Sequence, residues 1–135
     1  MEDDVNVLKI RLNDLVKEFE DALKLKTQYE VQLNSLKESK DSFEANLKHV
    51  VLNEKDNEGK KLYSNEEMRK NALVRLCNSS DEHSEFRRKI AKFEELLGDV
   101  VIRLEVLKKR FGVGLKEADL LVALMNFKKE MGGKE

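Results

Sequence analysis

The residues that could carry chemistry in this 135-residue chain are few. The single cysteine is Cys77, and the two histidines are His49 and His83. A reactive cysteine needs a neighbouring base, and Cys77 lies on the apolar side of its predicted helix with no histidine beside it in sequence, so we interpret it as a buried structural thiol. Antiparallel pairing of the two arms would place the histidines tens of ångströms apart. We therefore expect neither a metal site nor a cofactor.

Paired carboxylates are frequent, and Glu66-Glu67 and Glu94-Glu95 are examples. General acid and base catalysis needs two acids in a cleft with separated pKa values, whereas these pairs stand among lysines and arginines on helix exteriors. The segment Asp56 to Gly59 has the letters of a calcium loop without its alternating ligands or its twelfth-position glutamate. We predict a solvated charged surface and no enzyme.

Basic clusters are the stronger functional candidates. Residues 65–111 hold eleven Lys and Arg against nine Asp and Glu, while residues 1–52 hold eight against eleven. We interpret this asymmetry as charge pairing between the arms of a hairpin. The alternative is a phosphate-contacting surface that binds nucleic acid. Its candidate residues are Arg87, Arg88, Lys89 and Lys92.

Two long heptad seams must position these side chains. Apolar residues recur at alternating steps of three and four, which indicates helices packed lengthwise against a partner. Lys26 and Lys40 interrupt the first seam, where their methylenes can pack while the ammonium groups stay wet. The first seam is Val5, Leu8, Leu12, Leu15, Phe19, Ala22, Tyr29, Leu33, Leu36, Phe43, Leu47 and Val50, and the second is Phe86, Ile90, Phe93, Leu97, Val100, Leu104, Leu107 and Phe111.

Turn signals set the expected boundaries. Ser64 with Glu67, and Ser79 with Glu82, have capping-box spacing, so we expect one helix start after a polar turn and a break near 78–81. The Gly112-Val113-Gly114 stretch predicts a helix end. The resulting single domain, 1–131, has helix 5–52, turn 53–64, helix 65–77, helix 80–111 and a short helix 115–131, with 132–135 as a flexible tail.

The expected fold class is all-α. Two arms of similar length joined by a short turn predict a long antiparallel helical hairpin, coiled-coil-like. The short C-terminal helix would pack on one end of it or reach across to the partner. Apolar positions outside the strict seam, such as Val16, Val31 and Ile102, widen the stripe, so we expect self-association, most simply a homodimer that completes a four-helix bundle.

Composition limits the partners. The chain has 26 Lys and Arg against 27 Asp and Glu, and the net charge of −1 gives no overall attraction to nucleic acid or to an anionic membrane. The acidic start, Met1-Glu2-Asp3-Asp4, is unlike a secretory signal, and no apolar run reaches the roughly 20 residues that span a bilayer. We expect a soluble cytoplasmic protein.

The segment Asp56 to Leu73, with Gly59-Lys60, Leu62 to Glu66, Arg69 and Ala72, resembles the turn of small coiled-coil proteins from bacteriophages and prophages. Their second arm ends in a stretch similar to Leu104 to Phe111. The resemblance implies a non-enzymatic interaction or accessory protein of a bacterial or phage-infected cell, or a nucleic-acid-binding factor in phage recombination or replication. In the first case Tyr63, Asn65 and Arg69 would contact an unidentified protein partner, or else would brace the corner.

Overall fold

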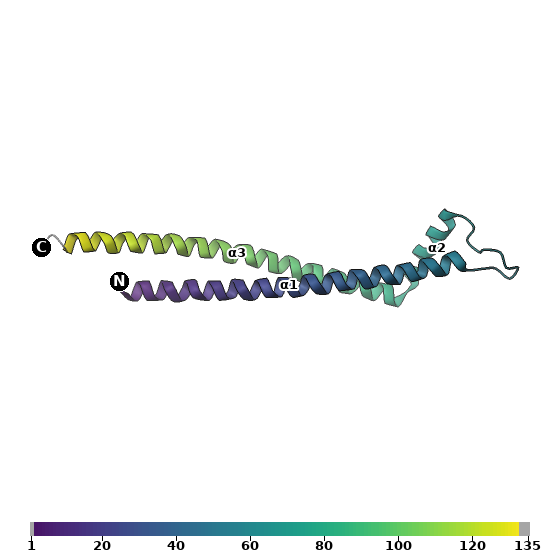
Figure 1. Ribbon diagram of the computed structural model, residues 1–135, viewed down its shortest axis with the longest axis horizontal. Helices are drawn as coiled ribbons and strands as arrows, with labels where there is room; N and C mark the ends of the chain where they lie inside the picture. Colours follow the sequence, from purple (N-terminus) through teal and green to yellow (C-terminus); the bar gives the residue numbers. More distant parts are fainter. Residues whose placement is uncertain (1, 133–135) are drawn as a thin grey trace. The chain divides into compact units, whose positions relative to one another are not determined.

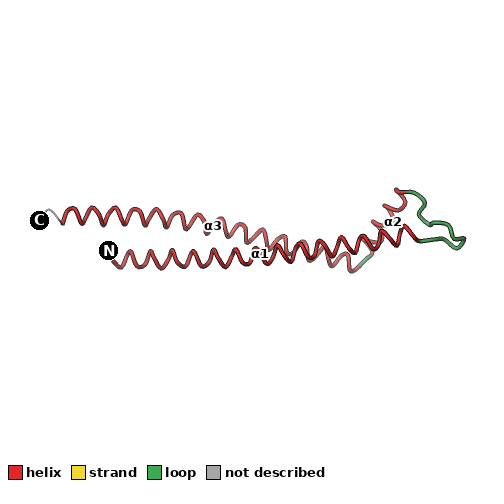
Figure 2. The backbone as a smooth tube through the Cα atoms, in the orientation of Figure 1, coloured by secondary structure: helices red, strands yellow, loops and turns green. Residues whose placement is uncertain are grey.

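The chain is all-α, as the seams predict. The computed structural model describes residues 2–132 and has three helices in this range, α1 (Glu2–Asn53), α2 (Glu66–Ser79) and α3 (Asp81–Gly132), with no β-strand among the described residues. Figure 2 shows the loop that links α1 to α2 and the short link before α3. The chain divides into two compact units, unit 1 from residues 1–28 and 98–135 and unit 2 from residues 29–97.

In each unit, segments of α1 and α3 pack antiparallel as a helical hairpin. In unit 2, Tyr29 packs on Phe93 with ring centroids 5.9 Å apart, and Phe43 packs on Phe86 at the same centroid distance. In unit 1 the start of α1 lies beside the later part of α3 (Figure 1). α3 packs along α1 and has the same 52-residue length, and in unit 2 α2 also lies against the end of α1.

The heptad seams make the core. The buried and half-buried apolar positions of both long helices follow steps of three and four, because such steps keep one face of a helix toward its partner. At the end of α1 the seam passes through Val51, which is 2% exposed, and not through Val50, which is 52% exposed. The predicted end of the first seam was therefore wrong by one residue.

The loop after α1 closes on itself. Gly59 has a φ of 82°, a conformation that glycine adopts without steric cost, as its position in the turn predicts. The Asp56 side chain accepts hydrogen bonds from the amides of Glu58 and Lys60, each at 2.9 Å. The Asp56 amide donates to the Lys60 carbonyl at 2.8 Å. Asp56 thus organises a turn through its side chain and backbone, and this role accounts for the likeness of Asp56 to Gly59 to a calcium-binding loop.

The cap of α2 is Asn65 and not the predicted Ser64. The Asn65 side chain accepts a hydrogen bond from the Met68 amide at 2.8 Å, so it satisfies one of the free donors of the first turn. Asparagine and serine cap about equally well, and the spacing of Ser64 to Glu67 therefore could not decide between neighbours. The helix begins one residue later than predicted.

The predicted break near 78–81 is confirmed. α2 ends at Ser79 and α3 begins at Asp81, with Ser80 in extended conformation between them. The Ser80 hydroxyl accepts from the His83 amide at 3.2 Å, so Ser80 caps α3 where the spacing pointed to Ser79.

The predicted helix end at Gly112 to Gly114 is wrong. α3 continues to Gly132, so there is no separate helix 115–131, and of the predicted tail 132–135 only Gly132 belongs to the described residues. The heptad steps pass through this region as Phe111, Gly114, Ala118 and Leu121. Gly114 is buried, and a Cβ added there would stand 2.5 Å from Leu12 Cδ2. Gly114 is therefore a small seam residue that makes room for leucine.

Candidate functional site

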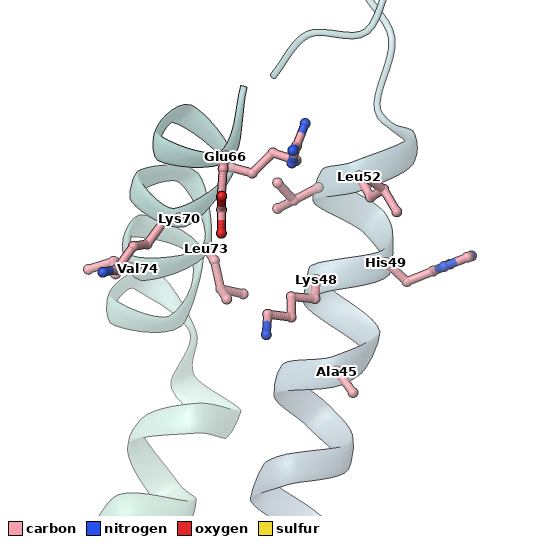
Figure 3. Close-up of a pocket in the computed structure, with 10 residues that line it drawn as sticks. Ala45, Lys48, His49, Leu52, Glu66, Lys70, Leu73 and Val74 are labelled. Carbon is pink, nitrogen blue, oxygen red and sulfur yellow. The ribbon is translucent and has the colours of Figure 1, made fainter. Parts of the chain in front are cut away.

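An apolar groove lies in unit 2 between the end of α1 and α2. We call it the tip groove, and Figure 3 shows Lys48 of α1 and Leu73 of α2 pointing into the space between the helices. Its apolar part includes Val74, which is 51% exposed, and Leu52, which is 41% exposed. The lining residues are Ala45, Lys48, His49, Val51, Leu52, Glu66, Arg69, Lys70, Leu73 and Val74. Leu73 thus faces the space between the helices, while Val74 and Leu52 leave exposed apolar surface on their outer sides (Figure 3).

Charge around the tip groove is mainly positive. Lys48, Arg69 and Lys70 bring three cations, and Glu66 brings one carboxylate. The fifth polar residue, His49, has its ring nitrogens 3.2 and 3.3 Å from the Asn53 amide nitrogen. A groove with an apolar floor and a cationic rim suits an amphipathic segment whose apolar face is flanked by carboxylates.

The three predicted partner-binding residues meet at the start of α2. Asn65 is spent on the helix cap, and the Arg69 guanidinium donates to the Tyr63 carbonyl at 3.5 Å. Tyr63 and Arg69 are both half-buried. All three residues therefore help to hold the corner between the loop and α2. Arg69 also lines the tip groove. The sequence pointed to this region but gave no sign of the apolar groove, because the groove forms only when α2 folds against α1.

The predicted nucleic-acid residues form a basic stripe (Arg87, Arg88, Lys89, Lys92) on the exposed side of α3. Glu85 neutralises part of it. The Arg88 Nη2 atom lies 2.5 Å from Glu85 Oε1, and Lys89 Nζ lies 3.8 Å from the same oxygen. The Arg88 hydrogen bond holds the pKa of Glu85 below its ordinary value, and the same bond raises the pKa of Arg88. Nucleic-acid binding by the stripe stays a prediction.

Ion pairs join α1 to α3. Lys37 of α1 lies 3.7 Å from Glu94 of α3, and Arg11 of α1 pairs with Glu117 of α3. In both pairs the cation comes from the more acidic first arm, whereas Arg88 and Lys89 pair within α3.

Unit 1 exposes apolar side chains beside its seam. We call this surface the unit 1 face, and it includes Val7 at 63% exposure, Ile10 at 61% and Val113 at 57%. Its groove is also lined by Arg11, Lys109 and Arg110 and by Asp14, Glu18 and Glu117, three cations and three carboxylates. Apolar surface with balanced charge is suited to contact with a copy of itself.

A polar cluster lies in the core of unit 2. The Glu44 carboxylate, the Cys77 sulfur and a ring nitrogen of His83 are all within 4.8 Å of one another. His83 Nε2 lies 2.8 Å from Glu44 Oε1, and the seam lysine Lys40 has its Nζ 3.3 Å from the same oxygen. Cys77 is 8% exposed and His83 is 6% exposed. The prediction that Cys77 is buried is confirmed.

The cluster changes the acidity of its members. The hydrogen bond from His83 is the main reason that the pKa of Glu44 lies below its ordinary value, and Lys40 adds a second hydrogen bond. Burial raises the pKa of the Cys77 thiol, and the Glu44 charge raises it further, while Lys40 and Arg87 act in the opposite direction. The thiol is therefore protonated at neutral pH unless a cation binds it.

Sequence reasoning missed this cluster because it treated Cys77 and His83 as unrelated. Five residues separate them, and the break at Ser80 changes the chain direction between α2 and α3, so both side chains reach the same part of α1. Glu44 is 33 residues before Cys77 and comes from α1. The signal in the sequence was the combination of a predicted break with a cysteine before it and a histidine after it.

Comparisons with protein-family models, with curated proteins and with solved structures give no match for this chain. The resemblance to phage coiled-coil proteins therefore stays a prediction. None of the helices within residues 2–132 has an apolar stretch of the length needed to cross a membrane.

Proposed function

We propose that this protein is a non-enzymatic helical interaction protein that binds an amphipathic, acidic segment of a partner protein in the tip groove. The observation that carries the proposal is the cationic rim, Lys48, Arg69 and Lys70, around exposed apolar side chains. Helix-in-groove binding uses the same two features, since apolar anchors provide affinity and complementary charge selects the partner.

The position of the groove supports this reading. Asn65 caps α2 and Arg69 holds the Tyr63 carbonyl, so the α2 wall of the groove is fixed before a partner arrives. A preformed wall lowers the ordering cost of binding. The α1 wall is part of a 52-residue helix whose Val51 side chain is fully buried.

The test uses two synthetic peptides with the same apolar face, one flanked by glutamates and one by lysines. Fluorescence anisotropy with the full chain should show tighter binding of the glutamate peptide. The double variant Lys48→Glu, Lys70→Glu should weaken this binding at least about tenfold and reverse the preference, because unlike charges become like charges. Both lysines are exposed, so the melting temperature should stay close to that of the wild type.

A matched control keeps the same net charge. Lys17 and Lys24 are exposed on α1 outside the tip groove, and the variant Lys17→Glu, Lys24→Glu should bind the glutamate peptide like the wild type. Equal binding of both peptides, or equal loss in both double variants, would contradict groove binding. A salt-sensitive gel shift with DNA or RNA at about 50 mM salt would instead favour the basic stripe, since phosphate contacts are strongest at low salt.

We also propose that the protein forms a homodimer through the unit 1 face. Its exposed valines and isoleucine cost free energy in water, and its equal numbers of cations and carboxylates allow each copy to pair with the other across a twofold axis. This contact leaves the tip groove, which belongs to unit 2, free for a different partner.

A further inference from the structure

We propose that Cys77, His83 and Glu44 bind a divalent transition metal, with Zn²⁺ as the ion that the donors fit best. A thiolate and an imidazole are ligands that zinc prefers over magnesium or calcium, and a carboxylate is a common third donor. Sites with three protein donors complete the tetrahedron with water. The donors come one from each helix, Glu44 from α1, Cys77 from α2 and His83 from α3.

The distances are close to those of a formed site. Zinc bonds are about 2.3 Å to sulfur and about 2.0 Å to nitrogen or oxygen, so donors on a tetrahedron stand roughly 3–4 Å apart. The three donor atoms here lie within 4.8 Å of one another. Donors at most 4.8 Å apart need to approach by only about 1 Å to reach these separations.

His83 supplies an independent reason to expect a ligand. Its ring is 6% exposed, and Nδ1 has no hydrogen-bond partner among the described residues. Buried polar nitrogens nearly always have a partner, so this one calls for an explanation. Either ring nitrogen of a histidine can bind a metal, so a cation at Nδ1 would supply the missing partner.

Binding would exchange a proton for the metal. The Cys77 thiol releases its proton to solvent, its sulfur lone pair forms the bond to Zn²⁺, and no electron is transferred. The charged groups that face Cys77 are Glu44 and Lys40 on α1 and Arg87 on α3. Affinity for the metal should increase with pH, because the thiol must lose its proton to bind.

The bound ion would join three helices at the break near Ser80. α2 and α3 meet there through a single extended residue, and the metal would tie both to α1. A metal that binds only the folded chain stabilises it, so the melting temperature becomes dependent on zinc concentration. This proposal concerns the interior of unit 2 and does not depend on the tip groove.

The test titrates Co²⁺, a spectroscopic substitute for zinc, into the full reduced chain. A thiolate-to-cobalt charge-transfer band should appear, saturate at one equivalent and disappear when Zn²⁺ displaces the cobalt. Cys77→Ser should abolish the band. Calorimetry with Zn²⁺ should show affinity losses of at least about 100-fold for Cys77→Ser and His83→Gln. The loss for Glu44→Gln should be at least about tenfold, because loss of a ligand costs no less than loss of a group around it.

His49→Gln is the matched control, because it removes the other histidine, which is exposed on the same helix as Glu44. This variant should bind Zn²⁺ like the wild type. Circular dichroism of each metal-free variant establishes that it is folded. A folded wild type without the charge-transfer band would overturn the proposal, and so would zinc affinity that follows His49 instead of Cys77 and His83.

Discussion

Two adjacent valines at the end of α1 separate core from surface. Val51 is 2% exposed and Val50 is 52% exposed. Val51→Ala should lower the free energy of unfolding by about 2 kcal/mol, since it removes two buried methyl groups and leaves a cavity. Val50→Ala should change it by less than about 0.5 kcal/mol. Urea denaturation of both variants measures the difference, and equal losses would place the seam at Val50 as the sequence suggested.

Glu44 should make stability depend on acid. The folded state holds its pKa below the ordinary value of 4.5, mainly through the His83 hydrogen bond, so its contribution to stability is present above that value. The contribution is lost as the pH falls through the folded pKa. Wild-type stability should therefore drop more steeply between about pH 5 and pH 3 than that of Glu44→Gln.

The control for this pH dependence is Glu38→Gln, which changes an exposed carboxylate on the same helix. Chemical denaturation at a series of pH values compares the three proteins. The Glu38 variant should follow the wild type. A pH profile of Glu44→Gln that coincides with the wild type would show that the His83 contact contributes nothing.

The burial or backbone conformation of a single residue was predictable where the local sequence pattern alone determined it. The buried state of Cys77 followed from its place on the apolar side of a helix, and the positive φ of Gly59 followed from a polar turn. The contact of Cys77 with His83 could not be read in the same way, because it depends on the direction that the chain takes after Ser80. The contact with Glu44 also depends on the register between α1 and the later helices.

At the scale of elements, the start of α2 gives a direct test of its cap. Asn65→Ala should lower the free energy of unfolding by about 1 kcal/mol, because the Met68 amide loses its acceptor. Ser64→Ala should have a smaller effect, since its hydroxyl caps no backbone amide of α2 and lies 3.8 Å from the Met68 sulfur. Thermal denaturation compares the two variants. A larger loss for Ser64→Ala would restore the predicted capping box.

The continuity of α3 can be tested at its glycines. Gly112 is inside the helix, and an added Cβ would meet no atom within 4 Å, so Gly112→Ala should stabilise by up to about 1 kcal/mol through helix propensity. Gly114→Leu should destabilise by roughly 1–3 kcal/mol, because the seam already holds Leu12 there. Destabilisation by both would indicate that the helix ends at these glycines, as the sequence predicted.

The helices themselves were predictable because seam periodicity persisted for many turns. The error at Gly112 to Gly114 arose from reading glycine as a helix end, although the seam continues through Gly114, Ala118 and Leu121. Small residues at seam positions hide the periodicity that a search for large apolar side chains detects. Gly98 shows the opposite case, since it faces no neighbour and is simply tolerated inside α3.

At the scale of the whole molecule, the proposed dimer predicts a concentration-dependent mass. The double variant Ile10→Glu, Val113→Glu places like charges on the unit 1 face and should be monomeric at concentrations where the wild type is dimeric. Sedimentation equilibrium measures both. The control Val31→Glu changes an equally exposed valine in unit 2 and should leave the dimer intact. A wild type that stays monomeric throughout would remove this part of the proposal.

The antiparallel hairpin was the part of the architecture that sequence could supply, because two seams and one polar turn leave few other arrangements. The identity of the second arm was not predictable in the same way. Both residues 65–111 and the observed Asp81–Gly132 match α1 in length to within a few residues. The observed second arm begins with α2, which lies against the end of α1, and continues as α3 beyond the predicted end at Phe111.

The loop between α1 and α2 also has a practical use. The Asp56 amide donates a hydrogen bond to the Lys60 carbonyl, and the Leu62 amide donates one to the Glu54 carbonyl. These two hydrogen bonds hold the two sides of the loop together beneath its exposed turn. A short segment that carries a fluorophore, inserted after Asn57, would lengthen the turn while both hydrogen bonds can still form. Such a label would report peptide capture in the neighbouring groove by a change in emission, without a substitution in either helix.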